Sequence, residues 1–556
     1  MEPTDPDTKA DTNEEEIVEY IVGNWESWKY ARKAKEQIWQ DCLNNYLTIV
    51  DESKYTNWPW RCKVSDTFSQ EIGDIAASAL KNALFPFDEE FYRLEPLDDI
   101  AQVYQDKMKK YLDSKLKESR FIERYRPFLK QLAVIGNSAA FLPWKTITRP
   151  KKIRTRSGVQ TYDDVVYDLF RFDTLDMLNV VLNPDSIYSE DSPIIIRSLH
   201  SLASLKSMKE YKNLDKLEAS IIESKHPAPT ESDDMFVQQR KQVFGLDGNV
   251  DGEEVELLSC RGDMEINGKV YRDYVGVVAN RKFLIQFKEN PFWGGRPVVF
   301  SGYSSMWYTP YGIGPLEPVK GIHELINTFT CQKADILNLI IMGSFAYVND
   351  GIIDPDNLFN RPAGAIEVGD INNIKPLAPN ANVALAYQEI AQLRDRGERS
   401  SGVTDIEAGV FPGGRKTAYE AGLLKQGSFG RFSEVIKHIG ETSVEYPLNF
   451  FLTSLKQFKY GSGEIEDEAL LGKYKIEYFG ASLSEARNND LSKLAQLADM
   501  ASKMGQLQVA IDPVEFMQEW RRVLGIKNSR ILRSPEQVEA ELNRQKQLEA
   551  AKVLGK

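Results

Sequence analysis

Cysteine and histidine are scarce in this chain of 556 residues, which holds four of each. The cysteines form no CxxC pair and none has a histidine nearby, and the histidines are too dispersed for a shared metal ion or a catalytic base. We therefore expect a reducing compartment, with no zinc site and no disulfide framework. The residues concerned are Cys42, Cys62, Cys260, Cys331, His200, His226, His323 and His438.

Long apolar runs are also lacking. No stretch reaches the length of a membrane-spanning helix, and the opening residues, MEPTDPDTKADTNEEE, lack the basic and apolar regions of a signal peptide. These absences predict a soluble, intracellular protein with no membrane partner.

Positive charge is not in excess, because the formal net charge is −13. Each phosphate that a protein neutralises tightens its hold on nucleic acid, so a protein that coats DNA through a broadly basic face is disfavoured. A protein that lets DNA slide past without holding it remains compatible with this charge.

The common motifs of hydrolytic enzymes, GxSxG and HExxH, do not occur. The segment GVFPGGRKT (409–417) approaches a nucleotide-binding P-loop, but Lys416 stands one place late and no strand-like run precedes it. The tripeptide RGD at 261–263 is expected to form a turn between strands. The aspartates of 350–357 lack the ligand spacing of an EF-hand and are expected in a solvated turn. We predict no enzyme activity, no metal site and no cofactor.

What is present is an ordinary folded composition, 42% apolar and 11% aromatic, in a chain long enough for several domains. Helical spacing runs from residue 17 to about 84 and again over 100–135, where Gly136 is expected to end a helix just before a short strand. Short β-like runs fill 141–200 and 254–300. This pattern predicts an α+β fold.

The second half of the chain alternates helices with irregular segments. A long helical pattern covers 316–342, with His323 expected on its polar side, and a turn-rich β-like insert follows Gly343. A second helix is expected over 384–399, then a glycine-rich loop, and then a long helix from Thr417 that bends at Pro447.

Several segments carry a family resemblance through their order along the chain. They are VIGNSAAFLPW (134–144), YGIGPLEPVKGIHELINTF (311–329), RPAGAIEV (361–368), GERSSGVTD to GGRKTAYEAGLLK (397–425), YFGASLSEARNNDLSKLAQ (478–496) and GIKNSRILRSPEQVEAE (525–541). In these segments the chain resembles the portal proteins, or head-to-tail connectors, of short-tailed, podovirus-type phages.

The resemblance implies a ring, usually a dodecamer, at one vertex of the capsid, through which double-stranded DNA is packaged and later ejected. Its partners would be the terminase large subunit, which is the packaging ATPase, a tail adaptor protein, and the major capsid and scaffolding proteins. The protein would be part of the virion and would lie in the host cytoplasm during assembly.

The resemblance also implies a portal fold made of a helical and β-containing wing, a helical stem, a small α/β clip, a long wing helix and a helical crown. In order, these are a flexible acidic N-terminus (1–16), the wing (17–315), a stem helix (316–342), the clip (343–384), a second stem helix (385–400), the tunnel loop (401–416), the long wing helix with a following strand (417–480), the crown (481–530) and a C-terminal helix or barrel segment (531–556).

The glycine-rich loop gains a role from this resemblance. Its glycines permit a sharp turn into the following helix, and a ring would repeat its two cations around the channel as weak contacts for DNA. A solvated helix start, with the cations incidental, is the alternative. The hinge residues are Gly409, Pro412, Gly413 and Gly414, and the DNA-facing residues are Arg415 and Lys416.

Three arginines near the end of the second stem helix, Arg394, Arg396 and Arg399, are further candidates for the channel wall. Their alternative is a set of salt bridges between subunits with residues such as Asp395 and Glu398.

The clip carries more apolar side chains than a short exposed loop should expose by itself. Pairing with a neighbouring subunit would bury them, and the outer rim would dock the packaging motor and later the adaptor. A self-contained β-unit within one subunit is the alternative. The residues are Ile352, Ile353, Leu358, Phe359 and Ile366.

Two other functions compete with the DNA channel. A DNA-packaging enzyme or nucleotide-dependent motor subunit would use the near P-loop at 409–417. A tail or baseplate scaffold fits the composition but not the order of helix, insert, helix and loop.

Overall fold

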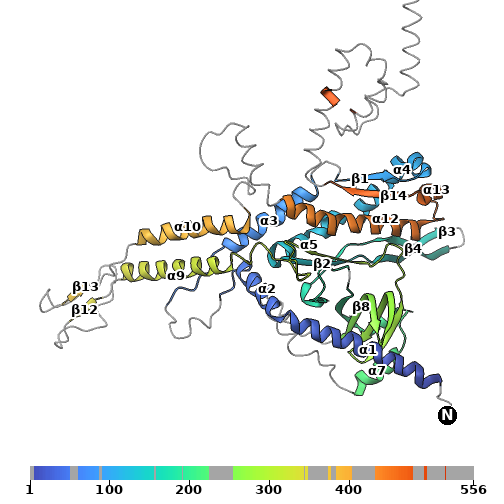
Figure 1. Ribbon diagram of the computed structural model, residues 1–556, viewed down its shortest axis with the longest axis horizontal. Helices are drawn as coiled ribbons and strands as arrows, with labels where there is room; N and C mark the ends of the chain where they lie inside the picture. The colour runs from blue at the N-terminus through green and yellow to red at the C-terminus, as the bar shows by residue number, and fades with distance from the viewer. Residues whose placement is uncertain are drawn as a thin grey trace, which may run out of the picture. The chain divides into compact units, whose positions relative to one another are not determined.

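The computed structural model describes residues 6–50, 61–86, 91–155, 158–190, 192–208, 210–223, 254–342, 345–347, 374–376, 383–403, 433–479, 494–496 and 520. The chain divides into two units, residues 1–81 with 94–476, and residues 82–93 with 477–556. The first unit holds nearly all the described helices and strands (Figure 1). In the second, the Tyr478 hydroxyl donates a 3.4 Å hydrogen bond to the Leu84 carbonyl.

The described helices lie along most of the chain. They are α1 (Pro6–Ala31), α2 (Lys33–Tyr46), α3 (Phe68–Leu84), α4 (Asp99–Glu118), α5 (Phe121–Ile135), the short η2 (Met177–Asn179), α6 (Leu202–Ser207), α7 (Leu214–Glu223), α9 (Lys320–Met342), α10 (Val383–Ser401), the π-helix η5 (Gly440–Glu445), α12 (Tyr446–Lys459) and α13 (Asp467–Leu471).

The described strands form five separate sheets, and each pairing whose register is given is antiparallel. The largest sheet has five strands in the order β10 (Phe283–Glu289), β9 (Lys269–Ala279), β8 (Glu254–Ile266), β7 (Ile194–Ser201) and β6 (Val180–Leu182). A three-stranded sheet has the order β11 (Val298–Gly302), β2 (Asn137–Phe141) and β5 (Asp173–Leu175). The three two-stranded sheets pair β3 (Trp144–Thr155) with β4 (Gly158–Phe170), β1 (Tyr92–Pro96) with β14 (Tyr474–Tyr478), and β12 (Phe345–Tyr347) with β13 (Ile374–Pro376). This mixture of helices and separate antiparallel sheets agrees with the α+β class, whereas the division into wing, stem, clip and crown stays a prediction.

Side chains alternate between the two faces along each strand of the five-stranded sheet, and helices cover both faces. On β8, Leu258 and Cys260 pack with Ile21 and Trp25 of α1. Their neighbour Leu257 belongs to the opposite face, which α6 and α7 cover. The sheet is therefore a layer between α1 and the α6–α7 pair.

An aromatic cluster joins α5, β4 and α12. The Phe170 and Phe451 rings stack with their centroids 3.9 Å apart, and Phe121 meets Phe451 edge-on at 5.7 Å. The buried Tyr125 hydroxyl is satisfied by Ser443 Oγ at 2.6 Å. Ring pairs of this kind add stability beyond their buried area, so α12 is firmly held in the body.

The predicted change from helix to strand at Gly136 is confirmed. Gly136 ends α5 in the left-handed region, with φ of 75°, and β2 begins at Asn137. A Cβ atom at Gly136 would lie 2.2 Å from the backbone nitrogen of Gly314, so the two chain segments touch through their backbones. The Asn137 amide donates to the Gly312 carbonyl at 3.0 Å and its oxygen accepts from the Gly312 N–H at 2.7 Å. Two separate segments of the family resemblance, 134–144 and 311–329, therefore meet in space.

Two local expectations differ from the structure. Helix α1 begins at Pro6, whereas the helical pattern was expected only from residue 17. The RGD tripeptide lies inside β8, and not in a turn between strands. Gly262 there has φ of 125° and the register shifts between Gly262 and Met264, as at a β-bulge.

The helix that contains Pro447 is interrupted just before this residue by the π-helix η5. Residues 433–439 are helical, η5 follows, and α12 continues with Pro447 in its first turn. Proline has no N–H to donate to the carbonyl four residues earlier, so the wider π turn lets the helix pass this point without ending.

Candidate functional site: the α9–α10 hairpin

Helices α9 and α10 lie side by side and antiparallel, and they lead away from the sheets of the first unit (Figure 1). The insert between them includes the short β12–β13 ribbon, in which Phe345 pairs with Pro376 and Tyr347 with Ile374. Both helices were predicted from the sequence, the first of them from its apolar stripe. Helix α9 begins at Lys320 because the preceding residues form tight turns, such as Glu317 N–H to Gly314 O at 3.3 Å. We call the pair the α9–α10 hairpin.

The root of the hairpin, nearest the sheets, is tied down by residues 61–67, which we call the strap. The backbone N–H of Cys62 donates to Asp335 at 2.7 Å, and that of Asp66 donates to Asn327 at 2.7 Å. Both acceptors are on α9. Backbone N–H groups of the strap thus donate to side chains of the hairpin, and these hydrogen bonds replace those that a neighbouring strand would provide.

Arg394 of α10 completes this attachment. Its guanidinium lies 2.6 Å from an Asp66 oxygen and 3.2 Å from a Glu71 oxygen, and its Cζ is 5.5 Å from the centroid of the Phe68 ring. The carboxylates come from the strap and from α3. Charge-assisted hydrogen bonds of this kind join three segments at one point.

His323 is fully buried at the root, which corrects the expectation that it faces solvent on α9. Its Nδ1 lies 3.0 Å from Ser69 Oγ, while its Nε2 has no hydrogen-bond partner among the described residues. Burial lowers the pKa of His323, because the charged imidazolium loses solvation. His323 lies on the side of α9 that faces α3 and α10. The apolar spacing of α9 alone could not show this contact.

Gly397 lets α10 approach the body closely. A Cβ atom there would lie 2.4 Å from Cζ of the buried Phe68 ring. Leu393, four residues earlier on α10, is buried on the same face as Gly397. The close packing therefore depends on the absence of a side chain at 397.

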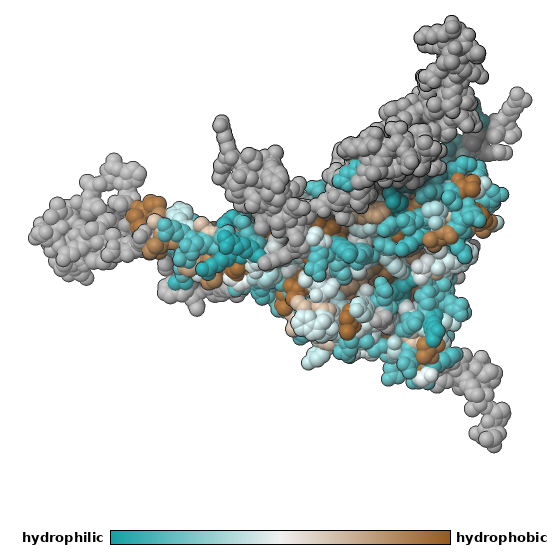
Figure 2. Space-filling model, turned by 45° about the horizontal axis from the view of Figure 1, so that its top comes forward, coloured by the Kyte–Doolittle hydropathy of each residue, from teal (hydrophilic) through white to brown (hydrophobic). Residues whose placement is uncertain are grey.

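The part of the hairpin farthest from the root, which we call the far half, differs from the root in composition. Residues 336–342 of α9 and 383–388 of α10 carry no charged side chain. Ile341 is 74% exposed and Leu385 is 58% exposed, with Ile340 and Tyr387 also exposed. Figure 2 shows apolar surface at this end of the hairpin. A solvated helix pair normally places charged residues on its outer face, so this surface is typical of one that is covered by another chain.

Three of the predicted channel residues lie in the described part of the chain, Arg394, Arg396 and Arg399. Arg394 is engaged within the chain by the carboxylates of Asp66 and Glu71. Arg396 is exposed, and Arg399 forms an exposed ion pair with Asp395 at 2.8 Å within the same helix. The described ion pairs of Arg394 and Arg399 join residues of the same chain, and contacts of the three arginines with a neighbouring subunit or with DNA stay predictions.

The remaining predicted site residues lie outside the described part of the chain. These are Gly409, Pro412, Gly413, Gly414, Arg415 and Lys416 of the predicted tunnel loop, and Ile352, Ile353, Leu358, Phe359 and Ile366 of the predicted clip.

A groove of about 520 Å³ lies where the C-terminal end of α10 meets residues 303–305, 313–318 and 434–438. His438 Nε2 is 2.8 Å from Ser305 Oγ there, and burial lowers the pKa of His438. The groove is lined mainly by small polar, apolar and glycine residues, with Tyr303, Glu434 and His438 as its titratable side chains.

Within the described ranges, no cluster of three or more histidine, cysteine, aspartate or glutamate side chains could hold a metal ion. No described helix has both the length and the apolar character needed to cross a membrane.

No protein-family model matches the chain, and no curated protein matches it in sequence. One solved structure with similarity to it is described as the neck of an empty GTA particle computed with C6 symmetry. The likeness covers 78% of this chain and 86% of that chain, with 10% identity and a TM-score of 0.33.

Proposed function

We propose that this chain is the subunit of a portal ring at one vertex of a phage capsid, through which double-stranded DNA is packaged and ejected. The observation that carries the proposal is the uncharged, apolar far half of the α9–α10 hairpin. The ordered sequence segments that resemble portal proteins give the same interpretation.

A single hairpin cannot cover its own outer flanks, because two helices share only one contact line. Copies placed side by side around an axis cover each flank with a neighbouring hairpin. An apolar side chain gains about 1.5–3 kcal/mol when fully buried, and the gain is repeated at every interface of a closed ring. The strap and Arg394 hold each hairpin at its root, so that it projects from the body in a fixed direction.

The other parts follow from the resemblance. The channel wall would be α9 and α10, the clip at 343–384 would dock the packaging ATPase and then the tail adaptor, and the crown at 481–530 would face the capsid interior. Arg415 and Lys416 would form a cationic collar around the DNA. On a chain of net charge −13, such a collar gives weak contacts while the remaining surface repels phosphate.

Electron microscopy of the purified full chain tests the proposal. Particles that are annular in axial view are the expected result, together with no turnover of ATP. A strictly monomeric protein at every concentration and ionic strength overturns it. ATP hydrolysis that is abolished by Lys416→Ala would instead favour a motor subunit.

A further inference from the structure

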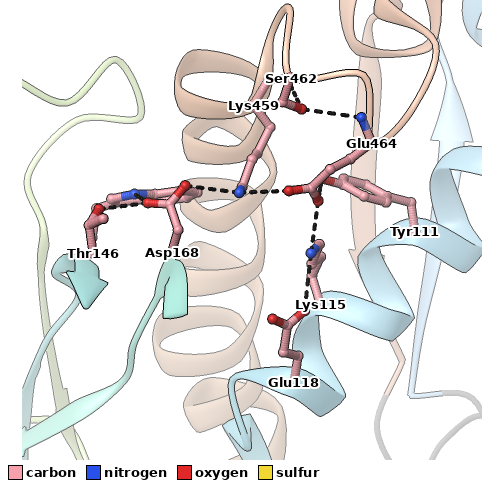
Figure 3. A network of polar contacts seen from close by, with 9 residues as sticks. Tyr111, Lys115, Glu118, Thr146, Asp168, Lys459, Ser462 and Glu464 are labelled. Carbon is pink, nitrogen blue, oxygen red and sulfur yellow. Dashed lines mark hydrogen bonds and ion pairs between the residues drawn. The ribbon is translucent and has the colours of Figure 1, made fainter. Parts of the chain in front are cut away.

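The β3–β4 ribbon is a two-stranded sheet whose base is anchored and whose outer part is not. At the base, Asp168 of β4 accepts from Trp144 Nε1 at 2.9 Å and from Thr146 Oγ1 at 2.6 Å, and it pairs with Lys459 at 2.9 Å. Lys459 also contacts Glu464 at 2.8 Å, and Lys115 of α4 pairs with the same carboxylate (Figure 3). This network fixes the direction in which the ribbon leaves the body.

The carboxylate of Glu464 is the centre of the network. Lys115, Lys459 and the Tyr111 hydroxyl all donate to it, and together they lower its pKa to about 2 despite partial burial. The base is thus a stable attachment at neutral pH, and the outer ribbon cannot fold back without breaking it.

The outer part of the ribbon has the composition of a contact surface. From residue 145 to 154 every described side chain of β3 is exposed. On β4, Val165 and Val166 are 55% and 53% exposed, and a β-bulge leaves Val166 with no cross-strand partner. A two-stranded ribbon alone is marginal in water, and it offers unpaired backbone groups along both edges. An additional contact would stabilise it.

The ribbon is also strongly basic on one strand. Strand β3 has five cations and no acidic residue. Lys151 pairs with Asp164 at 3.0 Å. Within the described residues the other four cations have no ion-pair partner; they are Lys145, Arg149, Lys152 and Arg154.

A surface of opposite charge lies on α4 and α13. Leu97, Ile100, Val103 and Leu471 are all exposed, Val103 by 76%. They lie close together because Leu97 N–H bonds to Lys473 O at 2.8 Å and Tyr104 of α4 bonds to Glu468 of α13 at 2.6 Å. Exposed acidic residues outnumber exposed lysines around this apolar patch, and one of the lysines, Lys107, pairs with Glu466 at 2.9 Å. The acidic residues are Asp99, Asp106, Glu466, Asp467 and Glu468, and the lysines are Lys107, Lys110 and Lys473. We call it the α4–α13 patch.

We propose that the basic β3–β4 ribbon of one copy docks on the acidic-rimmed α4–α13 patch of a second copy. This inference rests on the proposed ring, which supplies each copy with a lateral neighbour. Both surfaces have an apolar centre and charged surroundings, and the signs of their charges are opposite. A contact between two different surfaces is heterologous, and it gives a ring when its rotation closes around an axis, as the proposed function requires. DNA would match the cations but would leave Val165 and Val166 exposed.

Charge reversal on the two sides tests the contact. The variants are Arg149→Glu with Lys152→Glu on the ribbon, Asp106→Lys with Glu466→Lys on the patch, and the combination of all four. Lys216→Glu with Lys282→Glu, two exposed lysines elsewhere, matches the charge change of the first pair. Ring fraction is measured by mass photometry, folding by thermal unfolding and DNA binding by fluorescence anisotropy.

Each reversed pair is expected to lower the ring fraction at least about tenfold, and the combination is expected to restore it, while the control stays at wild type. If wild-type rings form and both reversed pairs assemble equally well, the docking proposal is wrong and the portal proposal stands. Loss of DNA binding with normal rings in the ribbon variant assigns the ribbon to nucleic acid and also overturns the proposal. If the wild type itself forms no rings, the proposed function fails first.

Discussion

The two ends of the α9–α10 hairpin belong to the same two helices, yet they differ in charge and in their contacts within the chain. At the root, Arg394 has two carboxylate partners, His323 is buried against Ser69, and the strap donates backbone hydrogen bonds to α9. At the far half no charged residue is present over 336–342 and 383–388, and Ile341 is 74% exposed.

The difference shows which part of the hairpin one chain can stabilise by itself. The root has internal partners for nearly all its polar groups, so its loss should lower the stability of the monomer. The far half carries no charged side chain of its own, although Lys333 Nζ lies 4.3 Å from the centroid of the Tyr387 ring. Changes at its exposed isoleucines should therefore leave the monomer intact and act on assembly. Four predictions follow this division, from the largest expected effect to the smallest.

Ile340→Glu with Ile341→Glu should abolish rings without unfolding the chain. Each charge would be buried without a partner at every interface, at a cost of several kcal/mol, so we expect ring abundance to fall at least about a hundredfold. Sedimentation velocity measures the rings, and urea unfolding should change by no more than about 0.5 kcal/mol. Ile187→Glu with Val270→Glu, at exposed apolar positions outside the hairpin, is the matched control. Intact rings in the hairpin variant would show that the far half is not an interface.

Gly397→Ala should destabilise the monomer by about 1–3 kcal/mol, because the new methyl group overlaps the buried Phe68 ring. Chemical denaturation measures this loss. Gly321→Ala on α9 is the control: no atom lies within 4 Å of the added Cβ, so we expect a neutral change or a gain of up to about 1 kcal/mol. Equal behaviour of the two variants would contradict the close packing of α10.

Arg394→Ala should cost about 1–2 kcal/mol, since Asp66 and Glu71 lose their charged partner at a half-buried site. Arg399→Ala on the same helix removes only an exposed pair with Asp395, and its effect should stay below about 0.5 kcal/mol. Thermal and urea unfolding both measure the difference. If Arg394→Ala instead changed DNA retention while stability stayed at wild type, Arg394 would belong to the channel and not to the root.

His323 should make the stability depend weakly on pH. Its pKa is lowered from 6.5 in the folded state, so the unfolded chain takes up a proton first as the pH falls below 6.5. Stability is therefore lost from pH 6.5 down to the lowered pKa of the folded state, by at most about 1.4 kcal/mol per pH unit. In His323→Gln this slope should be reduced relative to wild type, measured by urea unfolding between pH 7 and pH 5. An unchanged slope would mean that His323 does not titrate differently on unfolding.

The sequence allowed the prediction of features that depend on local patterns. The helical patterns over 316–342 and 384–399 identified both helices of the hairpin, and Gly136 marked the end of α5 because a left-handed cap favours glycine. The α+β class followed from the same periodicities.

Features that depend on packing between distant segments could not be predicted. The burial of His323 requires Ser69, and the ion pairs of Arg394 require the strap, both more than two hundred residues away. The π turn near Pro447 is a local adjustment, but a proline in a helical pattern predicts a bend equally well. The bulge at Gly262 was mistaken for a turn because glycine serves both.

The contact between Gly136 and Gly314 has a mechanical consequence. Six residues after Gly314, α9 begins, and at Gly136 the chain passes from α5 into β2. Since the two main chains touch directly, with the Asn137 amide bonded to both polar groups of Gly312, no rotatable side chain lies between them to yield under load. A pull along the hairpin would therefore be transmitted to the sheet with little elastic deformation at this joint.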